Sequence, residues 1–169
     1  PPLSIVVAAA PGGASDILAR LLSQKLQPIL KRTVVVENRP GANSIVGATY
    51  VANAHADGYV VLLPDKTTVA LNPILQNKLP YSAQPLALWK IGEIDFFYAV
   101  RSQPPLRTWA GMLAYAKRNP GGVSVATTGA GSGSHISLEL MGRKFDTSFT
   151  NIPYKGMASA VQAVIEAIP

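Results

Sequence analysis

Cysteine is absent from the 169 residues, and its absence excludes disulfide bonds, thiolate chemistry and cysteine metal sites. Histidine is scarce as well, since only His55 and His135 occur. No second ligand stands at helical or hairpin spacing from His135, so we expect no metal site. No cofactor is expected either. Long apolar runs are missing too. The longest, residues 5–10, has the length of a strand, whereas a membrane-spanning helix needs roughly 20 residues.

Charged residues are also few, at 14% against 48% hydrophobic residues, so apolar burial can offset the ordering cost of folding. The net charge of +6 would suit nucleic acid or acidic small molecules. The basic pairs, however, stand where predicted helices end, and cations there complement the helix dipole. These pairs are Lys31-Arg32, Lys117-Arg118 and Arg143-Lys144. No basic stripe interleaved with aromatic residues occurs, so nucleic acid is not an expected partner.

The first part of the chain predicts a β-α-β unit. Residues 3–9 and 33–37 read as strands and residues 15–30 have helical spacing. A right-handed crossover makes the two strands parallel and places the turn after the first strand at its carboxyl end. The helix is expected to carry one apolar face, made of Ile17, Leu18, Leu21, Leu22, Leu26 and Ile29. Further predicted elements are a helix over 45–54, a strand over 59–63 and a short helix over 72–75.

From Leu79 the pattern changes to prolines and two strand-like runs, residues 86–91 and 95–101, which indicates a passage between lobes. Beyond it the spacing predicts five elements: a helix over 108–118 capped by Thr108, a strand over 123–127, a helix over 134–141, a strand over 149–152 and a helix over 159–167. We therefore expect an α/β fold with a first lobe over residues 1–100 and a second over residues 101–169.

Two glycine-rich corners, residues 11–16 and 128–135, each join a strand to a helix. Glycine lets the backbone turn sharply, and the start of a helix leaves several N–H donors without intrahelical partners. Such corners attract anions. We interpret the two corners as facing each other, with Ser15, Ser132 and Ser134 suited to hold a carboxylate.

The second corner matches no familiar phosphate or nucleophile motif. A dinucleotide fingerprint would need glycine at Ser134, and a nucleophile elbow around Ser132 would need glycine at Ala130 as well. An alternative interpretation is an α/β hydrolase or transferase fragment in which His135 activates Ser132 or Ser134. Asp16, in the first turn of its helix, is expected to cap amides or to contact a ligand that carries an amine or a hydroxyl.

Several short motifs follow one another in a characteristic order. They are Pro11-Gly12-Gly13-Ala14-Ser15-Asp16, Ala19-Arg20-Leu21-Leu22, Val36-Glu37-Asn38-Arg39-Pro40-Gly41-Ala42, Ala56-Asp57-Gly58-Tyr59, Leu79-Pro80-Tyr81, Gly129-Ala130-Gly131-Ser132-Gly133-Ser134-His135 and Pro153-Tyr154-Lys155-Gly156. In this order they resemble the substrate-binding proteins of tripartite tricarboxylate transporters, the Bug receptors of Gram-negative bacteria. The resemblance extends over essentially the whole chain.

The resemblance implies a periplasmic receptor rather than an enzyme, with a periplasmic-binding-protein-like fold of two Rossmann-like lobes and a ligand cleft between them. Such a receptor closes on a small organic anion, commonly a di- or tricarboxylate, and delivers it to the membrane subunits of the transporter. A monomer is expected for the full-length protein. The ligand-binding residues that the resemblance implies are Gly12, Gly13, Ala14, Ser15, Asp16, Thr67, Thr68, Gly131, Ser132, Gly133, Ser134 and His135.

The chain departs from this family most clearly in length. Members are nearly twice as long, and their later part completes the second lobe before returning to the first, so we expect this chain to be incomplete relative to them. In addition, Asn43-Ser44 stands where members often carry glycines, and residues 8–10 are all alanine where a proline and an aromatic residue are usual. The identity of the carboxylate is therefore left open, with the enzyme fragment as the alternative function.

Overall fold

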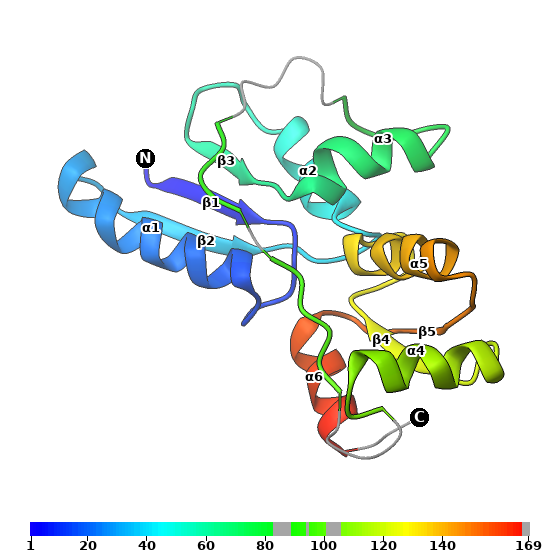
Figure 1. Cartoon of the computed structure of the whole chain (residues 1–169). Helices are drawn as coiled ribbons and strands as arrows, with labels where there is room; N and C mark the ends of the chain where they lie inside the picture. The colour runs from blue at the N-terminus through cyan, green and yellow to red at the C-terminus, as the bar shows by residue number, and fades with distance from the viewer. Residues whose placement is uncertain (83–88, 94, 101–105, 167–169) are drawn as a thin grey trace. The chain divides into compact units, whose positions relative to one another are not determined.

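The computed structural model describes residues 1–82, 89–93, 95–100 and 106–166. The chain divides into two compact units, Pro1–Glu93 and Ile94–Pro169, each with its own parallel sheet (Figure 1). None of the helices in these described ranges is both long and apolar enough to cross a membrane.

The first unit is built on a three-stranded parallel sheet in the order β2-β1-β3 (Figure 1). The strands are β1 (Leu3–Val7), β2 (Val34–Asn38) and β3 (Val60–Leu63). In register, Ile5 of β1 lies opposite Val36 of β2 and Val61 of β3. Three successive residues of β1, Ile5 to Val7, are buried, so both faces of the central strand are covered. The predicted β-α-β unit is confirmed, with its strands parallel.

Helix α1 (Ala14–Leu30) packs on the sheet through small residues. Ala19 is fully buried, and the Ser23 hydroxyl donates to the carbonyl oxygen of Val34 over 2.7 Å. The prediction that all the apolar residues of this helix share one buried face is wrong, because Ile17 and Leu21 are more than half exposed. At 100° per residue these two lie on the side opposite Ala19. The core around Ala19 consists of Ile5, Val7 and Val34, with Leu22 and Leu26 packed against it.

Helix α2 (Ile45–Ala52) covers the other face of β1, the face that carries Val6 and Ala8. Its Gly47 approaches Ala8 so closely that a Cβ atom at position 47 would lie 2.7 Å from the Ala8 Cβ. Glycine at this position therefore lets the helix backbone rest on the strand. After β3 the chain enters a π-helical turn, η1 (Thr67–Leu71), and then the expected short helix α3 (Asn72–Leu75).

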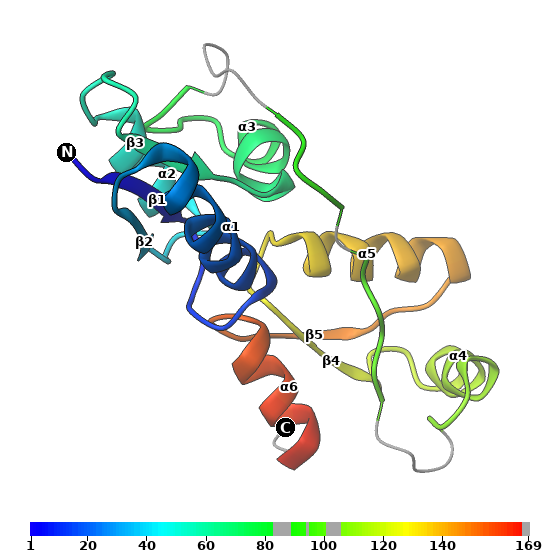
Figure 2. The same ribbon diagram turned by 90° about the vertical axis from the view of Figure 1, so that its left-hand side faces the viewer.

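The second unit pairs two parallel strands, β4 (Ser124–Thr127) and β5 (Thr150–Pro153). Figure 2 shows α5 (Gly133–Phe145) on one side of them and α4 (Trp109–Arg118) and α6 (Met157–Glu166) on the other. Met112, Ala116 and Val123 form the centre of a core between α4 and the strands. The predicted helices and strands are confirmed to within a few residues, α5 being four residues longer at its carboxyl end. Residue 167 of the predicted last helix lies outside the described residues.

The structure bears on the predicted cap of α4 and on the two strand-like runs. The Thr108 hydroxyl accepts from the amide of Gly111 over 3.1 Å, so the predicted cap of α4 is confirmed. The two strand-like runs are not confirmed as strands. Residues 89–91 and 95–100 form no strand, and the other residues of the runs lie outside the residues that the structure describes. No described strand of either unit pairs with these residues, so alternating apolar residues alone did not produce a strand there.

The basic pairs stand where expected, at the carboxyl ends of helices. Lys31 follows the last residue of α1 in a left-handed conformation, and the other two pairs occupy the last turns of α4 and α5. Cations in these places complement the exposed carbonyl groups, so stabilisation of the helix ends accounts for these basic pairs.

Candidate functional site

The first glycine corner connects β1 to α1 and is held in shape by Asp16. Gly12 has a φ of +81°, a left-handed conformation that favours glycine, and its amide donates to Asp16 Oδ2 over 2.9 Å. Arg20 Nε donates to the same oxygen over 3.0 Å. The hydrogen bond from Arg20 and that from Gly12 lower the pKa of the Asp16 carboxyl to about 2. The carboxylate therefore stays charged and ties the turn to the helix.

Beyond Asp16, the corner presents amides that the protein itself does not use. Among the described residues, neither the amide N–H of Ala14 nor that of Ser15 donates a hydrogen bond, and the Ser15 hydroxyl makes none either. Ala14 is exposed and Ser15 is half-buried. These donors lie at the positive end of a 17-residue helix, so the corner can receive an anion.

Asp16 therefore accepts from an amide of the turn, that of Gly12, and not from an amide of helix α1. Its side chain is 4% exposed, with Oδ2 engaged and Oδ1 buried without a hydrogen-bond partner among the described residues. Direct contact between Asp16 and a ligand stays a prediction.

Further along the same sheet edge, the chain after β3 comes close to the first corner. Ser15 and Thr68 line one small hollow of about 10 Å³, the space of roughly one water molecule. Thr68 is buried, and both its amide and its hydroxyl donate to Asp65 Oδ1, over 3.0 and 3.1 Å. Thr67 is buried too and does not line this hollow. The other lining residues are Ala8, Ala9, Ser44, Leu63 and Asp65.

Two polar residues of this hollow, Ser44 and Asp65, were not among the predicted site residues. Asp65 follows β3 almost directly, and a polar residue at the carboxyl end of a parallel strand is a signal that sequence alone could have supplied. Ser44 could not have been found in this way. It is the last of four consecutive residues with positive φ, from Gly41 at 132° to Ser44 at 71°, and only the folded backbone shows this.

The second corner connects β4 to α5 and is closed by a cluster of hydroxyl groups. Gly129 and Gly131 have φ values of +134° and +76°. The Ser132 hydroxyl caps α5 by accepting from the amide of His135 over 3.3 Å. Ser134 Oγ lies 3.0 Å from Ser132 Oγ and accepts from the amide of Thr128 over 3.0 Å. The serines therefore hold the loop in shape.

As in the first corner, some backbone amides have no hydrogen-bond acceptor among the described residues. The amides of Gly133 and Ser134, in the first turn of α5, donate no hydrogen bond to any residue that the structure describes. Both residues are half-buried. The second corner can therefore receive an anion by the same chemistry as the first.

His135 faces the loop rather than the serine hydroxyls. Its Nδ1 accepts from the amide of Gly131 over 3.0 Å, so the neutral ring carries its proton on Nε2. Nε2 lies 3.6 Å from Oε1 of Glu139, one helical turn away, a neighbour that the sequence interpretation overlooked. No described contact joins the imidazole to the hydroxyl of Ser132 or Ser134, so the pair required by the enzyme alternative is not assembled here.

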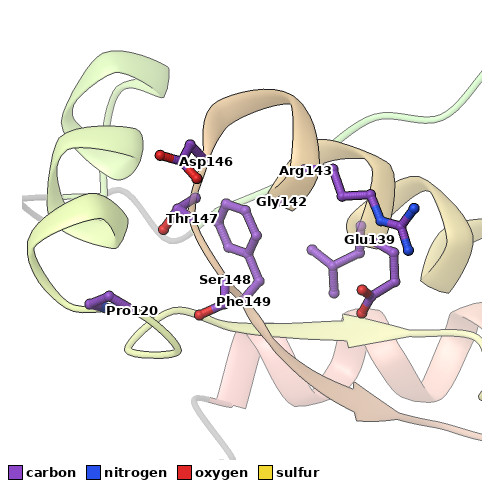
Figure 3. Close-up of a pocket in the computed structure, with 9 residues that line it drawn as sticks. Pro120, Glu139, Gly142, Arg143, Asp146, Thr147, Ser148 and Phe149 are labelled. Atoms are coloured by element: carbon purple, nitrogen blue, oxygen red, sulfur yellow. The ribbon is translucent and has the colours of Figure 1, made fainter.

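A larger hollow of about 430 Å³ lies in the second unit but includes neither corner (Figure 3). It is lined by the carboxyl half of α5 and the loop that follows, residues 146–149. Its charged side chains, Glu139, Arg143 and Asp146, are exposed and of mixed sign, so they do not converge on one ligand chemistry. In the part of the chain that the structure describes, no three acidic or histidine side chains are grouped as metal ligands would be.

Comparison with known proteins matches this chain to receptors. The family described as "Tripartite tricarboxylate transporter family receptor" matches residues 18–167. Among curated proteins, Protein BugT of Bordetella pertussis is 32% identical over 165 residues, covering 95% of this chain and 50% of that protein. A UPF0065 protein from the TAR-I ttuE-ttuC' intergenic region of Agrobacterium vitis is 36% identical over 167 residues, covering 97% and 48%. The chain therefore spans about half the length of these relatives.

Solved structures agree with the sequence matches. A structure described as a periplasmic transporter is 30% identical with a TM-score of 0.84, covering 98% of this chain and 56% of that one. Rpa4515 of R. palustris with adipate is 26% identical with a TM-score of 0.82, covering 97% and 56%. MatC from Rhodopseudomonas palustris with bound malate is 27% identical with a TM-score of 0.77, covering 98% and 57%. The expected α/β fold of periplasmic binding proteins is confirmed.

Proposed function

Because this chain belongs to the tripartite tricarboxylate transporter receptor family, we propose that it captures a small organic anion, a di- or tricarboxylate, and delivers it to the membrane subunits of such a transporter. Two relatives of solved structure hold dicarboxylates, adipate in one and malate in the other, which supports the ligand class. The family is one of solute receptors, and this supports a role in binding rather than in catalysis.

The observation that carries the proposal is the pair of helix amino ends with unused amides. Ala14 and Ser15 in the first corner, and Gly133 and Ser134 in the second, offer N–H donors at the positive ends of α1 and α5. A carboxylate accepts several such donors at once. We propose the corners as the ligand-binding residues, with Gly12, Gly13, Asp16, Gly131, Ser132 and His135 shaping them and Thr67 and Thr68 supporting the first.

We propose a periplasmic location, a monomeric state for the full-length protein, and no cofactor. The unit Pro1–Glu93 is proposed as the first lobe and the unit Ile94–Pro169 as the beginning of the second, which moves the boundary expected at residue 100 to residue 93.

Two variants that each add one negative charge test the function directly. Ser15→Asp places a carboxylate beside the unused amides of α1, where it repels an anion and competes for the same donors. Ser159→Asp is the matched control, because Ser159 is exposed in the first turn of α6 and belongs to neither corner. Both variants carry the same added charge at the start of a helix.

The measurement is thermal unfolding of each protein with a panel of dicarboxylates, tricarboxylates and acidic amino acids. A ligand at 100 times its Kd stabilises the folded protein by about 2.7 kcal/mol. We expect at least one acid to raise the Tm of the unaltered protein and of Ser159→Asp, and to lose this effect with Ser15→Asp. A panel that leaves the Tm of the unaltered protein unchanged contradicts the proposed function.

A further inference from the structure

Two buried polar side chains of the first unit, Asn72 and Tyr81, join segments that are separate in the sequence. Asn72, the first residue of α3, is fully buried, and Tyr81 is 9% exposed. Asn72 Nδ2 donates to the carbonyl oxygen of Asn43 over 2.8 Å and to the Tyr81 hydroxyl over 3.2 Å. The Tyr81 hydroxyl in turn donates to the carbonyl oxygen of Thr68 over 2.7 Å. The pair therefore ties the chain at Asn43 to the π-helical turn η1.

The segment that Asn72 holds has an unusual backbone. Ala42, Asn43 and Ser44 all have positive φ, at 44°, 56° and 71°, a conformation that residues with a side chain rarely adopt. A backbone of this kind persists only where surrounding contacts fix it, and it is typical of functional sites. The hydrogen bond from Asn72 reaches the middle residue of the three. It is therefore one of the contacts that keep this turn in its left-handed conformation.

In the other segment, Thr68 is held by two neighbours. Asp65 accepts from its amide and its hydroxyl, and Tyr81 donates to its carbonyl oxygen. π-helical turns such as η1 are rare and often occur at functional sites. Thr68 and Ser44 line the hollow beside Ser15, whereas the two buried side chains do not line it. The pair thus acts on the hollow from behind, through the two segments that wall it.

Packing alone does not account for the asparagine. Asn72 Oδ1 is buried without a hydrogen-bond partner among the described residues, and an unpaired buried acceptor lowers stability. A leucine has a similar volume and would avoid this cost. What the asparagine adds is its Nδ2, whose two hydrogens reach Asn43 and Tyr81. The amide is therefore explained by the segments that it joins.

We propose that Asn72 and Tyr81 are positioning residues that fix Ser44 and Thr68 beside Ser15 before a ligand arrives. The inference rests on the proposed function, in which the first corner receives a carboxylate. A wall that is already ordered binds more tightly than one that must become ordered on binding, because that ordering costs free energy. Loss of the pair should therefore loosen the two segments and weaken binding, although neither side chain lines the hollow.

Three variants test this inference. Tyr81→Phe removes only the hydroxyl, and Asn72→Leu removes the amide at similar volume. Tyr59→Phe is the matched control, because the hydroxyl of this half-buried tyrosine makes no hydrogen bond to any described residue.

The first measurement is amide hydrogen exchange by NMR. The Ile45 amide bonds within the left-handed turn over 3.1 Å, and the Val69 amide bonds at η1 over 3.4 Å, so each reports on one segment. The amide of Ser4, in the sheet, is the reference. We expect Tyr81→Phe and Asn72→Leu to speed exchange at Ile45 and Val69 but not at Ser4. The expected change is about tenfold, since one net hydrogen bond is worth roughly that factor.

The second measurement is the Kd by calorimetry, at a temperature at which each variant is folded, with malate, adipate and citrate as probes. Each probe that binds the unaltered protein should bind Tyr81→Phe and Asn72→Leu about tenfold more weakly, and Tyr59→Phe within about twofold. A purely structural role lowers the Tm but leaves the Kd of a folded variant unchanged. The Kd therefore separates positioning from stabilisation.

The outcomes also separate the two proposals. Exchange in Tyr81→Phe that equals that of the unaltered protein at Ile45 and Val69 overturns the inference, as does exchange that rises equally at Ser4. Faster local exchange with an unchanged Kd overturns it too, and all three results leave the receptor function standing. An unaltered protein that binds none of the probes, nor any other acid of the panel, contradicts the proposed function and the inference together. If Asn72→Leu fails to fold, Tyr81→Phe decides, since it removes a single hydroxyl.

Discussion

Replacing Asp16 with asparagine should destabilise the protein at neutral pH and not at acid pH. The asparagine side chain keeps an oxygen that can accept from Gly12 but loses the charge that Arg20 contacts. Lowering the pKa from 3.8 to about 2 is worth about 2 kcal/mol, since one pKa unit corresponds to about 1.4 kcal/mol. The Arg20 side chain is 54% exposed, and water screens its charge, so we expect a loss of about 1–2 kcal/mol.

The contribution of Asp16 to stability decreases as the pH falls. The folded-state pKa is depressed, so the contribution of Asp16 is fully present above the unfolded-state value near 3.8 and disappears as the pH falls through about 2. Urea unfolding at pH 7, 3 and 2, followed by tryptophan fluorescence, measures it. At pH 7 the free energy of unfolding of Asp16→Asn should be lower than that of the unaltered protein. This difference should fall to about half at pH 3 and should be small at pH 2.

Asp57 provides the control, because it is exposed in a surface turn and its Oδ1 accepts from the amide of Tyr59 over 3.0 Å. Asp57→Asn should change the free energy of unfolding at pH 7 by no more than about 0.5 kcal/mol. A loss in Asp16→Asn that is the same at pH 7 and pH 2 would refute the electrostatic reasoning. So would an Asp16→Asn protein as stable as the unaltered one at pH 7.

Two further changes test the packing and capping that position the corners. Gly47→Ala should destabilise the protein by about 1–3 kcal/mol in urea unfolding, because the new Cβ would lie 2.7 Å from the Cβ of Ala8. Gly92→Ala, whose Cβ would meet no atom within 4 Å, should not, and equal effects would show that close packing is not the cause. Thr108→Ala should cost about 1 kcal/mol, because the hydroxyl that accepts from Gly111 is lost. Thr108→Ser should restore most of that stability, and a serine variant as weak as the alanine variant would argue against the cap.

Much of the local structure followed from short-range patterns. The strand, glycine turn and helix at residues 3–30 were predictable because apolar runs, glycines and helical spacing act over a few residues. The cap at Thr108 and the basic pairs at helix ends were predictable for the same reason. The described part of one strand-like run, residues 95–100, forms no strand, because a strand forms only where another strand pairs with it, and none of the described strands does so there.

In the candidate site, too, some features follow from the local sequence and others depend on packing. The sequence by itself determined that two helices begin at glycine corners, and with them the presence of spare amides, because every helix start leaves donors without intrahelical acceptors. Only the tertiary structure decided which groups the protein uses internally. The Thr68 hydroxyl donates to Asp65, and His135 Nδ1 accepts from the amide of Gly131 in the loop, while contact of either residue with a ligand stays a prediction. Ser44 and Asn72 came to their places from distant segments. Such contacts depend on how separate elements pack, and no local pattern records that packing.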